Sequence, residues 1–300
     1  RTESVAIPAD AAAGARIWKA FDGGWIDFTV VPLAEARLTL DGSLRLRLEP
    51  NLPAETSARI TLAGTTVEAR LAPGTPWEHM FAAPAPTAEG ISPLPLSIVA
   101  GGLRLERSWQ LKTERGVAKL GRLENFQAGQ RLRKGKEEPL TQQTGAQAHW
   151  SDSSCGGQTR HGVFMHPPYM TGVGYAYATF DAVALPAEPK AVLRCQIGKA
   201  DGSDPGDGVL FRVAVVDGDG KETAVAEKSW IQHGWTPLEA DLSPWAGRRV
   251  QIKLIADVGP KDDSTGDWAC WADLRVESRE PTLLTTLQET PAAAPAAPRP

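Results

Sequence analysis

The sequence has no run of about 18 or more apolar residues, so no segment is suited to cross a membrane as a helix. It also has no long window with apolar residues at i, i+3, i+4 and i+7, the pattern of an amphipathic helix. The first residues, RTESVAIPAD, show neither the basic start nor the apolar run of a signal peptide. Export would therefore require that such a segment has already been removed.

Cysteine is scarce, with only Cys155, Cys195 and Cys270 in 300 residues. Three cysteines do not make a disulfide framework, and the absence of a CxxC pair excludes a zinc site of the usual spacing. Two alternatives remain open for them. They form one bridge with one cysteine left over, or they are buried free thiols.

Catalytic motifs are also missing. No Gly-x-Ser-x-Gly elbow and no phosphate-binding GxxxxGK[ST] loop occurs. A glycoside hydrolase needs two carboxylates, and catalytic pairs usually come from separate elements. The acidic candidates here crowd into one loop and its flanks, namely Asp257, Asp262, Asp263, Asp267 and Asp273. We therefore expect no catalysis within this chain, and glycoside hydrolysis if there is any.

The charge distribution argues against a nucleic-acid partner. The formal net charge is −4, and the one basic cluster, RLRKGK at 131–136, is followed at once by Glu137 and Glu138. A protein that binds a polyanion should instead present a basic face. We expect a solvated segment at 131–136.

What the sequence has in abundance is short alternating runs between Gly, Pro, Asp and Asn, which predicts an all-β protein. Its length favours two domains. Three hairpins, at 36–50, 57–71 and 94–111, predict an immunoglobulin-like β-sandwich over 1–120. The two domains are expected to be antiparallel sandwiches, the second of them jelly-roll-like.

The second half of the chain begins with a change of composition. Between residues 121 and 156 the apolar residues thin out, which predicts a polar linker or long loop. Residues 157–280 return to strands and predict the second sandwich. The tail at 281–300 ends in Pro and Ala repeats and is expected to be disordered.

One turn has the composition of a metal site. DGSDPGDG at 201–208 spaces Asp201, Asp204 and Asp207 three residues apart, and such oxygen ligands suit calcium. The alternative is a solvated acidic turn between two strands. Structural calcium is thus a candidate, and no other cofactor is expected.

The second domain contains four motifs in sequence order, namely GVFMHPPY (162–169), the hairpin around DGDG (217–220), PLEADLSPWAGRRVQIKLIADVG (237–259) and GDWACWADLRV (266–276). Together they resemble the NPCBM-type modules, which are jelly-roll carbohydrate-binding domains associated with family 98 glycoside hydrolases. Leu274 replaces the alanine that ends the last motif in the family. The resemblance covers residues 157–278 and implies sugar binding, with calcium a frequent companion.

A sugar site needs flat aromatic rings against C–H faces, together with fixed hydrogen-bonding groups. The candidate ligand-binding residues are His166, Tyr169, Trp235, Asp267, Trp268, Trp271 and Asp273. Strand alternation places Trp268, Cys270 and Leu274 on the core face, and Trp271 and Asp273 on the other. Tyr169, after two prolines, is the best expected platform, while Asp273 is expected to accept N–H bonds from the His166 loop.

These residues predict an exported protein, secreted, periplasmic or at the cell surface, that binds a glycan without chemistry. Its partners would be the glycan and an attached or separate glycan-active enzyme. Two alternatives stay open. The chain is an accessory region of a glycoside hydrolase whose catalytic part lies elsewhere, or it is a structural or cell-surface module for protein contacts.

Overall fold

The computed structural model describes residues 16–21, 24–29 and 31–289, and side chains from residue 31 onward. The described chain consists of strands, turns and one short 3-10 helix, η1 (Ser243–Trp245). The all-β prediction is confirmed. No helix among these residues is long and apolar enough to cross a membrane.

The chain divides into two compact units. Unit 1 comprises Arg1–Arg115 and Leu283–Pro300, and unit 2 comprises Gly116–Thr282. Unit 2 is thus inserted, in sequence, between two strands of unit 1. Its two ends meet, because the backbone N–H of Ser278 donates to the carbonyl of Ala118 at 2.8 Å and the Ser278 hydroxyl accepts from the Ala118 N–H at 3.0 Å.

Unit 1 is a β-sandwich of two sheets, ordered β3–β4–β7 and β23–β9–β8–β5–β6, with a separate pair β1–β2. The strands are β1 (Arg16–Phe21), β2 (Gly24–Thr29), β3 (Ala34–Asp41), β4 (Ser43–Pro50), β5 (Thr56–Leu62), β6 (Thr65–Leu71), β7 (Trp77–Ala82), β8 (Gly90–Ala100), β9 (Leu103–Gly116) and β23 (Thr282–Glu289). The three predicted hairpins are confirmed as the antiparallel pairs β3–β4, β5–β6 and β8–β9. Alternation places Leu44, Leu46 and Leu48 of β4 fully inside, against Ile60 and Trp109 of the other sheet.

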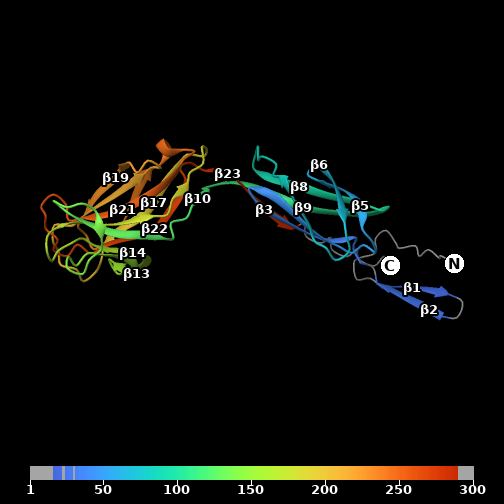
Figure 1. Cartoon of the computed structure of the whole chain (residues 1–300), viewed down its shortest axis with the longest axis horizontal. Helices are drawn as coiled ribbons and strands as arrows, with labels where there is room; N and C mark the ends of the chain where they lie inside the picture. The colour runs from blue at the N-terminus through green and yellow to red at the C-terminus, as the bar shows by residue number, and fades with distance from the viewer. Residues whose placement is uncertain (1–15, 22–23, 30, 290–300) are drawn as a thin grey trace, which may run out of the picture. The chain divides into compact units, whose positions relative to one another are not determined.

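Unit 2 is also a sandwich. Its first layer, here the β22 sheet, follows the order β13–β14–β22–β17–β20, with β10 beside β22 (Figure 1). These strands are β10 (Lys119–Gly121), β13 (Gln147–Cys155), β14 (Gln158–His166), β17 (Ala191–Lys199), β20 (Gly234–Asp241) and β22 (Ala269–Ser278).

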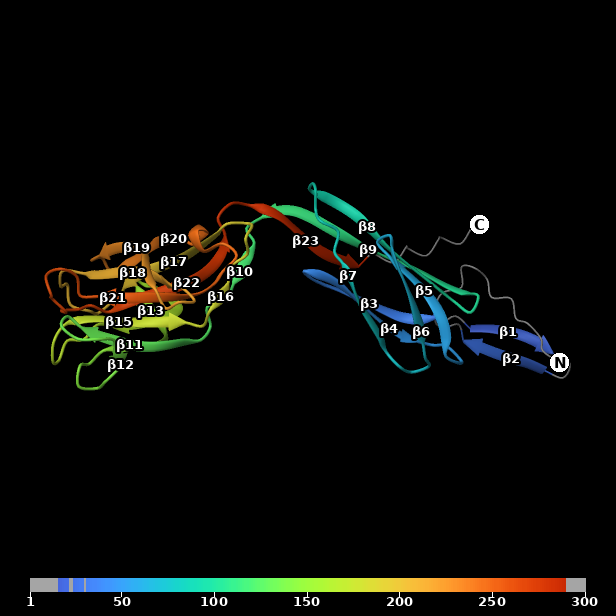
Figure 2. The same ribbon diagram turned by 45° about the horizontal axis from the view of Figure 1, so that its top comes forward.

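The second layer, here the β21 sheet, follows the order β12–β11–β15–β21–β18–β19, with β16 beside β21 (Figure 2). Its strands are β11 (Phe126–Leu132), β12 (Glu138–Pro139), β15 (Gly174–Phe180), β16 (Val183–Ala184), β18 (Val209–Val216), β19 (Glu222–Trp230) and β21 (Arg249–Asp257). The core lies between the layers, where Val163 and Trp271 of the first meet Phe211 and Leu254 of the second.

The segment expected to be a linker, 121–156, differs from that expectation. It contributes β11 and β13, which lie at or next to the edges of the two sheets and so need few apolar residues. Phe126 packs against Phe180, with ring centroids 5.3 Å apart. Gln130 is fully buried, and its amide donates to Glu138 at 2.9 Å. A buried glutamine that finds partners gives no apolar periodicity in the sequence.

The tail differs from the expectation as well. Residues 282–289 form β23, which pairs with β9 in unit 1. The Thr113 and Thr285 hydroxyls lie 3.2 Å apart across that pair. Residues 290–300, which contain the Pro and Ala repeats, lie outside the described part of the chain.

The predicted faces of β22 are wrong at its start, and a β-bulge is the reason. Trp271 is fully buried, while Trp268 keeps 38% of its surface exposed. The register of β22 against β17 shifts between Gln196 and Arg194, and Asp273 has φ +53°. The extra residue lets Trp271 and Leu274 face the same core. Strict alternation would put them on opposite faces.

Candidate functional site

A groove of about 690 Å³ opens at the loop end of unit 2. It lies among the end of β14, the β17–β18 loop and the β21–β22 loop, and we call it the aromatic groove. Its lining residues are Gln147, Phe164, His166, Tyr169, Gly202, Asp204, Ser264, Thr265, Gly266 and Trp268. The groove therefore unites three of the predicted ligand residues, namely His166, Tyr169 and Trp268.

The rings in the groove form two pairs. The His166 and Tyr169 ring centroids lie 4.5 Å apart, and those of Phe164 and Trp268 lie 6.4 Å apart at an interplanar angle of 74°. Tyr169 is 48% exposed, so its ring has free surface toward solvent. The groove thus offers flat apolar surface at two places along its wall.

The Tyr169 platform is held by its neighbours. The backbone N–H groups of Tyr169 and Met170 both donate to the carbonyl of Thr144, at 2.9 and 3.1 Å. Gly145 lies directly under the ring, where any Cβ would collide with it, and its φ of +72° also favours glycine. The ring is therefore fixed before a ligand arrives.

His166 supplies a neutral acceptor. Its Nδ1 donates to the carbonyl of Pro167 at 2.7 Å, which leaves Nε2 as an acceptor in the neutral ring. Burial lowers the pKa of His166 and outweighs the opposing effect of that hydrogen bond. The side chain is thus a neutral hydrogen-bonding group at pH 7.

Glycines let the two loops on the other side of the groove interlock. A Cβ on Gly206 would collide with the carbonyl of Thr265, and one on Gly266 with the carbonyl of Asp204. Trp268 is tied from both sides, because its N–H donates to Gly266 at 2.8 Å and its carbonyl accepts from Ala200 at 2.9 Å. These contacts fix the wall that carries the tryptophan.

A shallower hollow of about 280 Å³ adjoins the aromatic groove along β13. It shares Gln147, Phe164 and Trp268 with the groove and continues past His149 and Asp152. The Phe164–Trp268 pair therefore lines two adjoining hollows, which together offer room for more than one ring of a chain-like ligand.

Two other predicted ligand residues lie outside the groove. Trp235 donates from Nε1 to the carbonyl of Gln158 at 2.8 Å, and the Arg160 guanidinium lies 5.6 Å from its ring centroid. Asp273 forms an ion pair with Arg160, so the predicted tie from Asp273 to the His166 loop is wrong. The structure brings neither residue to the aromatic groove.

Trp271 and Asp267 are buried. The Trp271 ring packs edge-on against Phe211, with centroids 5.1 Å apart, and its Nε1 has no partner among the described residues. Asp267 is fully buried, and neither carboxylate oxygen has a hydrogen-bond partner in that same set. Both belong to the interior, which corrects the expectation that they face a ligand.

The three aspartates predicted to bind calcium do not form a site. Asp201 accepts the N–H groups of Gly156 and Gly157 at 2.7 and 2.8 Å, and these bonds lower its pKa. Within the described chain, no group of three or more His, Cys, Asp or Glu side chains is placed to hold a metal. The acidic turn is instead bonded, through Asp201, to the turn between β13 and β14.

A lysine provides the positive charge that calcium was expected to supply. Lys199 is fully buried, and its ammonium donates to the carbonyls of Asp204 and Pro205, the latter at 2.5 Å. Burial lowers the pKa of Lys199, while the nearby charges of Asp267, Asp204 and Asp207 oppose that effect. The residues present therefore suit an ammonium group and do not suit a calcium ion.

We expect the thermal midpoint of unit 2 to be the same in excess calcium and in a chelator. The reason is that the Lys199 ammonium already uses the carbonyls that a hard cation would need. The measurement is differential scanning calorimetry of the full chain with CaCl₂ or EDTA. A midpoint that rises with calcium concentration would contradict the assignment.

Three features of the groove were not anticipated. Phe164 and Gln147 lie on neighbouring strands that sequence analysis did not connect, because Gln147 falls in the expected linker. Gly145 precedes no obvious turn motif. The usable signal was aromatic spacing, since Phe164, His166 and Tyr169 lie within six residues of one another.

Comparison with known proteins gives limited similarity. No family model matches the chain. A segment of 123 residues is 33% identical to an uncharacterized protein of Archaeoglobus fulgidus and covers 38% of this chain and 30% of that protein. The match therefore spans less than a third of the relative.

Three solved structures show distant similarity. The CBM22-1–CBM22-2 tandem of Paenibacillus barcinonensis Xyn10C has a TM-score of 0.37 at 12% identity, covering 91% of this chain and 99% of that one. The CBM22-1–GH10 modules of Clostridium thermocellum xylanase 10B, complexed with xylohexaose, reach 0.30 at 12%, covering 45% and 25%. The module TmCBM61, in complex with β-1,4-galactotriose, reaches 0.24 at 16%, covering 56% and 86%. At TM-scores below 0.5, this similarity decides neither the fold nor the ligand of this chain.

Proposed function

We propose that unit 2 binds a neutral glycan non-covalently in the aromatic groove. The observation that carries the proposal is the pair of exposed rings, Tyr169 and Trp268, on the walls of one groove that also carries polar side chains. The C–H faces of a sugar would stack on these rings, and its hydroxyl groups would bond to His166, Gln147 and Thr265.

Neutral sugars are favoured by the charges around the groove. Among the described residues, no Lys or Arg lines it, and Asp204 is the one acidic residue of its lining. A sulfated or carboxylated glycan would find no cation to pair with here. The adjoining hollow along β13 gives space for further sugar units, so an oligosaccharide suits the groove better than a single ring.

The role of such binding would be to keep an attached or partner glycan-active enzyme close to its substrate, outside the cytoplasm. Assignment of unit 2 to the NPCBM-type jelly rolls is part of this proposal, supported by the motifs at 162–169 and 266–276. The module itself would perform no chemistry. A longer hydrolase that contains this chain is compatible with the same role.

Tyr169→Ala and Trp268→Ala are each expected to weaken glycan binding at least tenfold. Loss of one stacking surface removes about 1.4 kcal/mol or more of binding free energy. The full chain would first be screened on a glycan array, and the best ligand would then be titrated by calorimetry.

Trp150→Ala is the matched control. Trp150 is 38% exposed, as is Trp268, but it stacks on His161 and lies outside the aromatic groove. Its removal should leave the affinity unchanged. The proposal fails if no glycan is retained by the folded wild-type chain, or if Trp150→Ala weakens binding as much as Trp268→Ala does. Retention of a protein partner alone would instead support a protein-contact module.

A further inference from the structure

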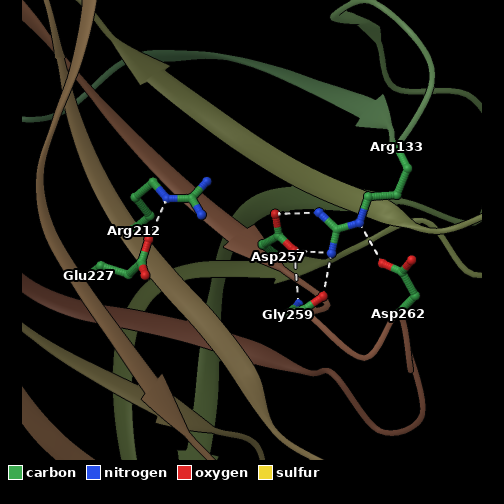
Figure 3. A network of polar contacts seen from close by, with 6 residues as sticks. All are labelled: Arg133, Arg212, Glu227, Asp257, Gly259 and Asp262. Carbon is green, nitrogen blue, oxygen red and sulfur yellow. Dashed lines mark hydrogen bonds and ion pairs between the residues drawn. The ribbon is translucent and has the colours of Figure 1, made fainter.

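Another hollow, of about 430 Å³, opens on the outer face of the β21 sheet. Its lining residues are Arg133, Leu210, Arg212, Glu227, Ser229, Asp257, Gly259, Pro260 and Asp262, and we call it the arginine pocket. Figure 3 shows its two arginine side chains on either side of Asp257. The site is distinct from the aromatic groove, with which it shares no lining residue.

Most of the N–H donors of Arg133 are bonded within the protein. Its terminal nitrogens donate to both oxygens of Asp257 at 2.8 and 3.0 Å, and its Nε donates to Asp262 at 2.5 Å. It also donates to the carbonyl of Gly259. The Asp257 side chain is only 3% exposed and accepts the Gly259 N–H as well, at 2.8 Å. This pair forms a rigid wall with little capacity left for a ligand.

Arg212 on β18 is different. Its Nε donates to Glu227 at 2.8 Å, but its two terminal nitrogens have no partner among the described residues. In Figure 3 these nitrogens extend from the Glu227 pair toward Asp257. A guanidinium carries five N–H donors, so four of them remain unused at this side chain, which is only 25% exposed. The ion pair with Glu227 fixes the Arg212 guanidinium in position.

The charges around the Arg212 guanidinium favour a neutral ligand over an anionic one. The pocket contains two arginines and three carboxylates, so it carries an excess of negative charge. A phosphate, sulfate or carboxylate group would be repelled by Glu227 and Asp262. A neutral polyol suits the pocket, because its hydroxyl groups accept from Arg212 and donate to Glu227, with Ser229 alongside. Leu210 and Pro260 add apolar surface for C–H groups.

We propose that the arginine pocket is a second sugar-binding site, in which Arg212 and Glu227 hold two adjacent hydroxyl groups of a neutral sugar. This inference deepens the proposed glycan binding and rests on it. Gly259, Pro260 and Asp262 line the arginine pocket, and residues 264–266 line the aromatic groove. The two sites therefore flank one loop, between β21 and β22, and the module binds sugar at two places.

The test is an NMR titration of the isotope-labelled full chain with D-glucose, D-galactose, D-xylose and D-glucuronate. At least one neutral sugar should shift two separate sets of amide signals. One set belongs to the aromatic groove, and the other to residues 210–212, 227–229 and 259–262. Arg212→Met should weaken the affinity reported by the second set of signals at least tenfold and leave the affinity reported by the first set unchanged. Trp268→Ala should have the opposite effect.

Arg194→Met is the matched control. Arg194 is also 25% exposed and also donates from Nε to a glutamate, Glu239, at 2.8 Å. Its terminal nitrogens, however, are taken by Glu277 and by the carbonyl of Arg279. Its replacement should leave both sets of shifts intact. Thermal midpoints of both variants, and the milder Arg212→Lys, would show that the fold is retained.

Any one of three results would refute the second sugar-binding site. The first is that neutral sugars shift only the signals of the aromatic groove, and the second is that Arg212→Met leaves the second set of shifts unchanged. The third is that D-glucuronate binds at the pocket more tightly than D-glucose. If longer glycans bind in the aromatic groove but no signal of the arginine pocket shifts, the proposed function survives and only this inference fails. If no glycan shifts the signals of either site, both proposals are refuted.

Discussion

Trp271→Ala is expected to lower the free energy of unfolding of unit 2 by about 3–5 kcal/mol. The Trp271 side chain is fully buried between the two sheets, where it packs edge-on against Phe211. Alanine would leave a large apolar cavity, and a close-packed β-sandwich collapses only partly around such a void. Trp268→Ala, three residues earlier, should change the free energy of unfolding far less, because Trp268 is partly exposed.

Urea unfolding of the full chain, followed by far-ultraviolet circular dichroism, measures both effects. Circular dichroism is preferable to tryptophan fluorescence, since the substitutions remove a fluorophore. The two tryptophans should give opposite outcomes, with Trp271→Ala acting on stability and Trp268→Ala on glycan binding. Equal destabilisation by both substitutions would contradict the assignment of Trp271 to the core.

The second large effect concerns Asp267 and pH. Burial, with a further contribution from the charge of Asp207, raises the pKa of Asp267 from 3.8 to about 8, and Lys199 opposes the increase. Between pH 4 and 8, approximately, the folded chain therefore holds a proton that the unfolded chain has lost. The free energy of unfolding should fall as the pH rises through this window, by an amount on the order of several kcal/mol.

Asp267→Asn should remove this fall, because an amide does not titrate. The difference in the free energy of unfolding between the variant and the wild type should grow from about pH 4 and level off above about pH 8. Urea titrations across that range give the curve. Asp263→Asn serves as the control in the same loop. Hydrogen bonds with Thr265 lower the pKa of Asp263, so the Asp263→Asn substitution should leave the fall in the free energy of unfolding between pH 4 and 8 in place. A flat wild-type curve would refute the assignment.

Local patterns predicted much of the fold. The hairpins around Asp41–Gly42 and Gly101–Gly102 followed from turn chemistry and strand alternation, both of which act over a few residues. The failure at β22 has an equally physical cause. Residues 268–272 are apolar on both faces, since Cys270 packs with Cys155 on the outer side and Trp271 packs inside. Without a polar residue in this stretch, alternation cannot reveal the bulge that follows it.

The candidate site was partly predictable for a related reason. His166 ends β14 and Tyr169 follows it closely in sequence, so their convergence needed no knowledge of the fold. The opposite wall depends on loops near residues 204 and 266, which only the tertiary structure brings together. No sequence pattern predicted the arginine pocket, because Arg133 lies in the segment expected to be a linker and Arg212 lies in an ordinary strand.

The way unit 2 interrupts unit 1 has a consequence for protein engineering. Lys119 and Glu277 are partners in the pairing of β10 with β22, so unit 2 starts and ends at nearly the same point. A folding unit whose two ends lie side by side can be excised, or inserted into another protein, without distorting the protein that carries it. Residues 116–282 could thus be grafted into a surface turn of another β-sandwich. The vacated host would need only a short turn between β9 and β23, which already pair with each other.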